Sequence, residues 1–253
     1  MSTDSPNNPP DFLISPLPSE AIYVWGGAQD IEGFQLAKGE EEAIAGDVSA
    51  KRREEFTRGR ACAHAALEQL AGRQGVVALP GFPSGHYAAH ADHLAIRRQG
   101  RAPQWPTGVV GAITHSHGAA AAAVARREDF LGIGIDLEPE SPSLERVASR
   151  ICHPDELAVI ADLPPSMQLG HLAVIFSIKE SIYKALNPAT GIYLGFQDAK
   201  IDMNTGGQGA GAEGFVRWKL LKDCTPVLEA GFQGEGKYLR QDGWTLSGVW
   251  VRA

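Results

Sequence analysis

The sequence has few cysteines and no long apolar run. The three Cys, at positions 62, 152 and 224, lack the spacing of metal-binding motifs, and so sparse and odd a number predicts reduced thiols. No stretch approaches the roughly 18 to 20 apolar residues that span a bilayer. The N-terminal segment has neither the basic nor the apolar region of a signal peptide. We therefore expect a cytoplasmic protein that makes no membrane contact.

An excess of positive charge is also absent. The 253 residues include 23 Lys and Arg against 30 Asp and Glu, a formal charge of −7, which argues against general attraction to nucleic acid or anionic membranes. Hydrophobic residues make up 43% and charged residues 21%, as in ordinary globular chains. Any basic surface must therefore be local, and the length fits one large domain or two small ones.

The apolar pattern predicts a mixture of helices and short strands. Residues 1–18 hold five prolines and predict an extended or flexible arm. Helices are predicted over 48–70 and 172–186, the second ended by Asn187-Pro188, with a short helix beginning near Pro154. The predicted strands are 21–27, 109–116, 120–126, 130–138, 199–203, 214–221 and 244–251. A helix over 118–127 stays open as an alternative, because alanine favours helices.

Two carboxylates end a buried apolar run. In FLGIGIDLE, Asp136 and Glu138 are two residues apart, so both side chains point to one face of a strand. Adjacent carboxylates repel each other unless a cation neutralises them, and oxygen ligands of this kind suit Mg²⁺. The alternative is a strand end that emerges into solvent at Pro139.

A third carboxylate lies in FSIKESIYKAL. Lys179, Glu180 and Lys184 fall within about a turn and a half of helix. Such a group fits a magnesium-bound pyrophosphate, because the carboxylate helps to hold the ion while ammonium groups neutralise phosphate oxygens. Two structural alternatives compete: Glu180 with Lys184 matches an ordinary surface pair, and Ser177 with Glu180 matches a capping box.

Positive charge concentrates in KRREEFTRGRACAHAAL. One face of the predicted helix carries Arg52, Phe56, Arg60 and His64. That face could line an anionic ligand, although a solvated helix of mixed charge is the more common outcome. Thr114-His115, at the end of an apolar strand, is a further candidate phosphate contact.

Three histidines in GHYAAHADH invite comparison with a zinc site. His86, His90 and His93 would align on a helix. Helix start and stop signals are poor there, and no nearby Glu completes an HExxH arrangement. We therefore do not expect zinc at this position.

Four segments, taken in order, resemble the 4′-phosphopantetheinyl transferases, specifically the enterobactin synthase component D-like branch of the Sfp-type superfamily. They are KRREEFTRGRACAHAAL, RAPQWPTGVVGAITHS, GIGIDLE and FSIKESIYKAL. The DxE pair followed by (F/W)SxKESxxKA is the specific part of the match. The resemblance implies an α+β fold, a pseudo-dimer of two similar α/β halves over 19–128 and 129–253, each a small antiparallel sheet packed on a long helix.

The resemblance also implies a reaction and a site. A monomer would transfer the 4′-phosphopantetheine arm of coenzyme A to a serine of an apo acyl, peptidyl or aryl carrier protein, with release of 3′,5′-adenosine bisphosphate. Glu180 and Lys184 would be the catalytic residues. Mg²⁺ would be held by Asp136, Glu138 and Glu180. The implied coenzyme A contacts are Arg52, Arg60, His64, Thr114, His115, Asp136, Lys179 and Lys184.

Two departures from the family pattern concern ligand binding. His64 stands where many relatives carry Arg, and Ala112–His115 replaces the commoner Ser-Ile-Ser-His. Thr114 keeps a hydroxyl, but a neutral His64 is expected to weaken phosphate binding. Two other classes stay open: a different Mg²⁺-dependent phosphoryl-transfer enzyme or phosphohydrolase, and a non-catalytic module that binds coenzyme A or a carrier protein.

Overall fold

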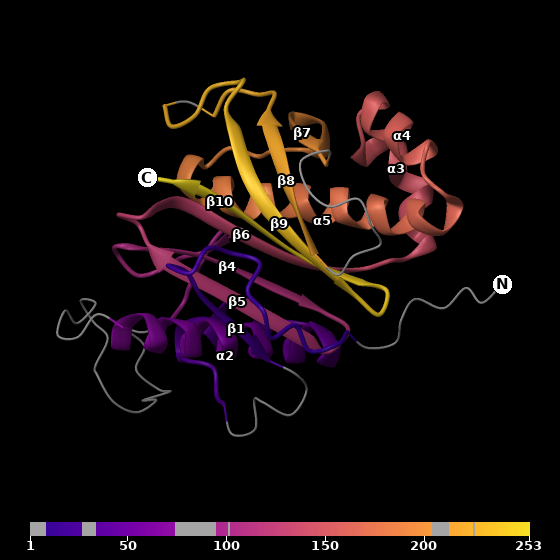
Figure 1. Ribbon diagram of the computed structural model, residues 1–253. Helices are drawn as coiled ribbons and strands as arrows, with labels where there is room; N and C mark the ends of the chain where they lie inside the picture. The colour runs from indigo at the N-terminus through magenta and orange to yellow at the C-terminus, as the bar shows by residue number, and fades with distance from the viewer. Residues whose placement is uncertain (1–8, 27–33, 74–94, 101, 204–212, 225) are drawn as a thin grey trace.

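The computed structural model describes residues 9–26, 34–73, 95–100, 102–203, 213–224 and 226–253 (Figure 1). The helices are α1 (Lys38–Glu42), α2 (Ala50–Arg73), η2 (Pro142–Val147), α3 (Ala148–Ile151), α4 (Pro154–Ala161), α5 (Pro165–Thr190) and η3 (Phe196–Asp198). The strands are β1 (Ile22–Gly26), β2 (Arg98–Gln99), β3 (Ala102–Pro103), β4 (Val109–Ser116), β5 (Ala119–Arg126), β6 (Phe130–Pro139), β7 (Ala199–Asp202), β8 (Glu213–Leu220), β9 (Gln233–Gln241) and β10 (Trp244–Arg252). The three histidines considered for zinc lie outside the described residues.

The N-terminal half packs α2 against a three-stranded antiparallel sheet in the order β1-β5-β4. Ala120 and Ala122 of β5 share a buried cluster with Ala63 and Ala66 of α2, so small side chains on both surfaces let the helix lie close. The Ala-rich stretch is thus a strand, and the alternative of a helix over 118–127 is wrong. Pairing with β1 and β4 and nearly complete burial override the helix propensity of alanine.

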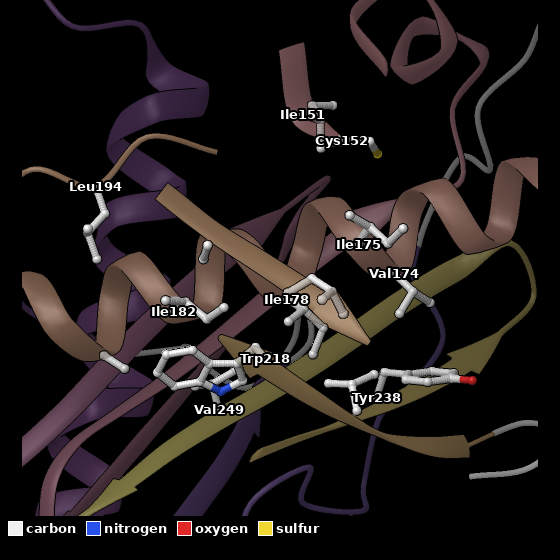
Figure 2. Packing of buried hydrophobic residues seen from close by; sticks show 14 of the residues in the cluster. Ile151, Cys152, Val174, Ile175, Ile178, Ile182, Leu194, Trp218, Tyr238 and Val249 are labelled. Carbon is white, nitrogen blue, oxygen red and sulfur yellow. The ribbon is translucent and has the colours of Figure 1, made fainter. Parts of the chain in front are cut away.

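The C-terminal half repeats this layout on a larger scale. Its five antiparallel strands run in the order β6-β10-β9-β8-β7, and α5 packs on them. Figure 2 shows Ile178 and Ile182 of α5 close to Trp218 and Val249 of the sheet, and all four are buried. The predicted α+β fold with two like halves is confirmed, although the sheets differ in strand number.

The two sheets meet between the layers formed by α2 and α5 (Figure 1), chiefly where β4 contacts β6. We call this β4–β6 contact the seam. Ile133 and Ile135 of β6 pack with alanines of β5 on the N-terminal side. Because side chains alternate along a strand, the positions of Gly132, Gly134 and Asp136 face the other way, toward α5. A Cβ atom on either glycine would overlap the backbone of α5, so this close approach requires glycine.

The helix α5 is longer than the predicted 172–186. It begins at Pro165, in the first turn, where no backbone donor is needed. It continues through Asn187 and Pro188 and ends at Gly191, which has a φ of 68° and donates its N–H to the carbonyl of Asn187. The prediction that Asn187-Pro188 ends the helix is therefore wrong, because one missing donor in the last turn is tolerated.

Residues 9–18 of the predicted arm lie against the body of the protein. Phe12 is 3% exposed and packs edge-on against the ring of Trp25. Tyr23 donates its hydroxyl hydrogen to the carbonyl of Phe12, and Trp25 donates its indole N–H to Asp11. This part of the arm is therefore held by side chains of β1.

Two observations bear on the membrane and on redox state. Among the described helices, none combines the length and the apolar character that a membrane crossing requires. Cys62, Cys152 and Cys224 are buried, and Cys152 and Cys224 are free thiols. Burial raises the pKa of Cys152 to about 12, so its thiol stays protonated near neutral pH.

Candidate active site

Beside the seam, a carboxylate of β6 meets an ammonium group of α5. Asp136 is 6% exposed, and its Oδ1 accepts a hydrogen bond from Lys184 Nζ at 2.7 Å. Lys184 also donates to the carbonyl of Ile135 at 3.2 Å. Asp136 Oδ2 is buried, and it has no hydrogen-bond partner among the described residues. A buried carboxylate oxygen of this kind is satisfied by a cation or a further donor.

Two further carboxylates interact with Asp136. Burial and the Asp136 charge raise the pKa of Glu138 to about 8. Burial and Asp136 also raise the pKa of Glu180, and Lys184 opposes both shifts. Each of these carboxylates would therefore be stabilised in its charged form by added positive charge.

The carboxylates are not gathered around one point. In the part of the chain that the structure describes, no group of three His, Cys, Asp or Glu side chains is arranged to hold a metal ion. The chemistry of the donors nevertheless fits Mg²⁺, which prefers carboxylate oxygens. The unpartnered Asp136 Oδ2 and the raised pKa of Glu138 fit it as well. The three side chains would have to move toward one another to bind a single ion.

Thr114 connects the two halves at this position. Its hydroxyl accepts a hydrogen bond from the backbone N–H of Leu137 at 3.1 Å. The same hydroxyl donates to Asp136 Oδ1 at 3.4 Å. Thr114 lies on β4 and the other two residues lie on β6, so these bonds cross the seam. A single hydroxyl group therefore holds Asp136 in register with the N-terminal half.

A small pocket opens beside the catalytic candidates of α5. Its volume is about 140 Å³, and Glu180, Tyr183 and Lys184 line one side. The other walls come from β4 and from Ala102–Pro103 of β3. A larger pocket of about 440 Å³ lies between α4, α5, β7 and β8 and includes none of the predicted site residues.

The basic face of α2 begins beside the end of β4. Arg52 Nη1 lies 2.8 Å from His115 Nε2, and Glu55 lies 3.6 Å from His115 Nδ1. Because a guanidinium group only donates, His115 Nε2 accepts this bond and its proton is assigned to Nδ1. Burial and the Arg52 charge lower the pKa of His115. His115 is therefore a neutral imidazole between α2 and β4.

Further along α2, a buried carboxylate lies against the basic residues. Glu40 is fully buried, and its Oε1 lies 2.8 Å from His64 Nε2 and 3.7 Å from Arg60 Nε. The backbone N–H groups of Ile96 and Ala37 also donate to it. Burial alone would raise the pKa of Glu40, but the bonds from His64 and the backbone outweigh burial and lower it.

Arg60 keeps unused hydrogen-bonding capacity. Its Nε is buried and has no hydrogen-bond partner within the described residues. Burial lowers the pKa of Arg60 to about 10, and the charges of Arg98 and Arg52 act in the same direction. The charge of Glu40 opposes this shift. An anion at this position would relieve the repulsion among the three arginines.

Sequence reasoning missed Glu40. It stands in the run Glu40–Glu42, and nothing in the sequence distinguishes the first glutamate from its two neighbours. In the fold, Glu40 is fully buried while Glu41 and Glu42 are exposed. The burial depends on residue Ile96, which is distant in sequence, so no local signal could have identified it.

Lys179 does not lie with the other predicted site residues. Its side chain is buried, and Nζ donates to Glu156 Oε2 at 2.7 Å and to the carbonyl of Ile151 at 2.8 Å. Successive residues of a helix point about 100° apart, so Lys179 faces α3 and α4 while Lys184 reaches β6. The pyrophosphate contact of Lys179 stays a prediction, and in this structure buried protein acceptors engage its ammonium group.

Together these features define an α+β protein in which an acidic cluster and a basic helix face meet at a seam between two like halves. A family model described as the 4′-phosphopantetheinyl transferase superfamily matches residues 132–224, and one described as the 4′-phosphopantetheinyl transferase N-terminal domain matches residues 40–125. The two matches contain α5 and α2 respectively. The chain belongs to the 4′-phosphopantetheinyl transferase family.

Individual relatives agree with this assignment. The chain is 39% identical to the 4′-phosphopantetheinyl transferase Svp of Streptomyces mobaraensis, over 75% of this chain and 71% of Svp. It is 33% identical to Npt of Nocardia iowensis, over 86% and 90% of the two chains. The holo-[acyl-carrier-protein] synthase structure of Thermotoga maritima matches 48% of this chain and 63% of that one, at 20% identity and a TM-score of 0.37, and carries no weight here. The family predicted from the sequence is confirmed.

Proposed function

We propose that the protein transfers the 4′-phosphopantetheine arm of coenzyme A to a serine hydroxyl of an apo carrier protein and releases 3′,5′-adenosine bisphosphate. The observation that carries the proposal is the Asp136–Lys184 pair at the seam, electrostatically coupled to Glu138 and Glu180. Membership of the family supports the reaction class. The acidic cluster on one half and the basic face of α2 on the other suit a ligand that carries a pyrophosphate and further phosphate.

The acidic residues Asp136, Glu138 and Glu180 would hold Mg²⁺. The buried, unpartnered Asp136 Oδ2 and the raised pKa values of the two glutamates support a divalent cation here. When bound, Mg²⁺ would supply positive charge to the pyrophosphate and to the charge that develops on its oxygens.

Glu180 and Lys184 would move the protons. Glu180, directly or through a water molecule, takes the proton of the carrier serine as the serine oxygen forms a bond to the phosphorus that bears pantetheine. The bond from that phosphorus to the bridging oxygen breaks, and Lys184 neutralises the leaving phosphate and donates a proton to it.

The basic face of α2 would receive the nucleotide phosphates. Arg52 is partly exposed, and Arg60 offers a buried Nε that has no hydrogen-bond partner among the described residues and lies 3.7 Å from Glu40 Oε1. Thr114 and His115 extend this surface onto β4. His64 is engaged by Glu40, so its contribution is to hold that carboxylate in place beside Arg60.

We also propose a cytoplasmic location. Cys152 and Cys224 are buried free thiols, which suits a compartment that keeps thiols reduced.

Intact-protein mass spectrometry tests the proposed reaction. Apo acyl, peptidyl and aryl carrier proteins are incubated with the protein, coenzyme A and Mg²⁺. We expect a phosphopantetheine mass gain on at least one carrier, and we expect EDTA or the substitution Glu180→Gln to abolish it. The matched variant Glu229→Gln, which changes an exposed glutamate in the same way, is expected to keep full activity.

Other outcomes of this experiment would support a different mechanism or one of the two alternative classes of protein. Wild-type transfer by Glu180→Gln would remove Glu180 from the mechanism. Product release from coenzyme A without any carrier would indicate a phosphohydrolase. Binding of coenzyme A without product on any carrier would indicate a binding module.

A further inference from the structure

The first lysine of the FSIKESIYKAL segment forms a buried ion pair outside the acidic cluster. Lys179 is 4% exposed, and its Nζ lies 2.7 Å from Glu156 Oε2. It also donates to the carbonyl of Ile151, the last residue of α3. Lys179 immediately precedes Glu180 in α5, so any rotation of the helix at Lys179 also moves Glu180.

Glu156 joins three segments of the chain. Its Oε2 accepts hydrogen bonds from Lys179 and from the backbone N–H of His153 at 2.6 Å, before the first turn of α4. Its Oε1 accepts from the backbone N–H of Ile201 in β7 at 2.7 Å. Glu156 is 4% exposed, so these bonds are shielded from water. One carboxylate thus ties α5 to α4 and to the far edge strand of the sheet.

Hydroxyl groups fix the opposite side of α5. Ser177 donates to the carbonyl of Asp136 at 3.2 Å. Ser177 and Ser181 each lie 2.8 Å from the hydroxyl of Ser247 in β10. The helix is therefore held by directional bonds from β6 and β10 on one side and from Glu156 on the other.

We propose that the Glu156–Lys179 pair sets the rotation of α5 and so positions Glu180 and Lys184 against Asp136, with Lys179 as a positioning residue instead of a phosphate contact. The inference rests on the proposed role of Glu180. The isoleucines of α5 also hold the helix on the sheet, but apolar contacts are non-directional. A buried ion pair adds little net stability compared with an apolar pair of similar size, whereas its bonds have fixed directions.

Steady-state kinetics on three variants test the inference. Lys179→Met and Glu156→Gln each break the pair, and Glu156→Gln combined with Lys179→Met removes both charges while it keeps an amide oxygen for the backbone donors at Glu156. Each is expected to lower kcat on the order of 100-fold, the effect of a misplacement of about 1 Å, with little change in the KM for coenzyme A. Because the two charges act on α5 through their shared ion pair, the double variant is expected to lose no more kcat than the worse single variant.

The double variant keeps the test interpretable if a single variant unfolds. It leaves no unpaired buried charge, so its unfolding temperature is expected to lie above those of the two single variants. Wild-type kcat in a folded double variant would overturn the inference. So would a raised KM for coenzyme A with unchanged kcat in Lys179→Met, because that result marks a phosphate contact.

Lys200→Met is the matched control. Lys200 of β7 pairs with Asp155 of α4, the neighbour of Glu156 in the chain, but the Lys200 side chain is 43% exposed. Exposed pairs contribute little, so we expect wild-type kcat. A loss equal to that of Lys179→Met would show that general packing at this junction, and not the buried pair, is responsible.

A second measurement separates this inference from the proposed function. Failure of the proposed function is seen in the wild type, as absence of transfer or as full activity of Glu180→Gln. Mn²⁺ affinity, measured by electron paramagnetic resonance with coenzyme A present, does not depend on turnover. We expect the Mn²⁺ affinity to fall in Lys179→Met and in Glu156→Gln, and by the same factor in both. Unchanged Mn²⁺ affinity in both variants would overturn the inference.

Discussion

The two halves bring a long helix close to a sheet by different means. In the N-terminal half, alanines of α2 meet alanines of β5, so methyl groups face methyl groups. In the C-terminal half, Gly132 and Gly134 of β6 leave room for the backbone of α5 itself. A layer of alanine methyl groups keeps the two backbones of the N-terminal contact apart, whereas the backbones of α5 and β6 are in direct contact and can separate only if one of the elements moves. The C-terminal contact is therefore the more position-sensitive of the two.

The two helices also differ in which segment supplies the carboxylates that face their charged side chains. The basic residues of α2 meet a carboxylate, Glu40, supplied by a separate segment. On α5, Lys184 and Glu180 meet Asp136 and Glu138 of the strand to which the helix is packed. Bond-making chemistry tolerates less displacement than phosphate binding. We therefore propose catalysis at the rigid contact between α5 and β6, and nucleotide binding at the adjustable contact between α2 and β5.

Substitution of a glycine at the rigid contact is expected to have the largest effect. In Gly134→Ala the new methyl group overlaps the backbone at Ser181, so α5 must move away from β6. We expect unfolding free energy to fall by about 1–3 kcal/mol and kcat to fall on the order of 100-fold. Urea unfolding and carrier-transfer kinetics measure the two effects.

Gly59→Ala in α2 is the matched substitution at the adjustable contact. The added methyl group meets only the side-chain Cγ2 of Ile113, at 2.8 Å. Alanine also favours the helix by up to about 1 kcal/mol, so we expect nearly unchanged stability and activity. Equal losses in Gly59→Ala and Gly134→Ala would contradict the distinction between the halves.

The buried carboxylate of the N-terminal half is expected to contribute stability without chemistry. Glu40→Gln keeps the shape but removes the charge that His64 and two backbone N–H groups bind. We expect a loss of about 1–3 kcal/mol in unfolding free energy at neutral pH. The exposed neighbour Glu41→Gln is the control and is expected to have no measurable effect.

The pH dependence follows from the direction of the Glu40 shift. The pKa of Glu40 is lower in the folded protein than its ordinary value of 4.5, so its contribution is present above that value. The contribution is lost as pH falls through the folded pKa. Urea unfolding at several pH values is therefore expected to show the stability difference between wild type and Glu40→Gln shrinking in acid. A constant difference would show that shape, not charge, matters.

Much of the fold and the acidic site follows from local sequence. The apolar run before Asp136 predicts a buried strand, and the two-residue spacing to Glu138 places both carboxylates on the face that meets α5. The register of Lys184 on its helix then brings an ammonium group to Asp136. These predictions succeed because strand and helix periodicities are local properties.

The sequence says least where long-range contacts decide the outcome. The spacing of Lys179 and Lys184 suggests a shared role, but only the position of α4 shows that Lys179 binds Glu156. The sequence suggests a phosphate contact for His64, and the position of Glu40 beside it depends on the tertiary fold. The Ala-rich strand needed its neighbours β1 and β4 to overrule its own helix propensity.

An arginine of the adjustable half is expected to affect binding and not turnover. Arg52→Ala removes a partly exposed guanidinium that contacts His115. Loss of one charge-assisted phosphate bond is expected to raise the Kd of coenzyme A by about tenfold, and the effect is expected to weaken in high salt. Isothermal titration calorimetry measures the affinity. Arg53→Ala, on an exposed position, is the control, and a fall in kcat for Arg52→Ala would contradict the division of roles.

The smallest effect on stability and turnover is expected for a conservative substitution at the seam. Thr114→Ser keeps the hydroxyl that accepts from Leu137 N–H and donates to Asp136, so we expect wild-type kcat and a change in unfolding free energy below about 1 kcal/mol. Thr114→Val keeps the volume but leaves the buried N–H of Leu137 without that acceptor, which is expected to cost about 1 kcal/mol or more and to lower kcat. Equal behaviour of the two variants in urea unfolding and transfer assays would mean that volume alone aligns the halves. A difference between them shows that one hydroxyl transmits the position of the N-terminal half to Asp136.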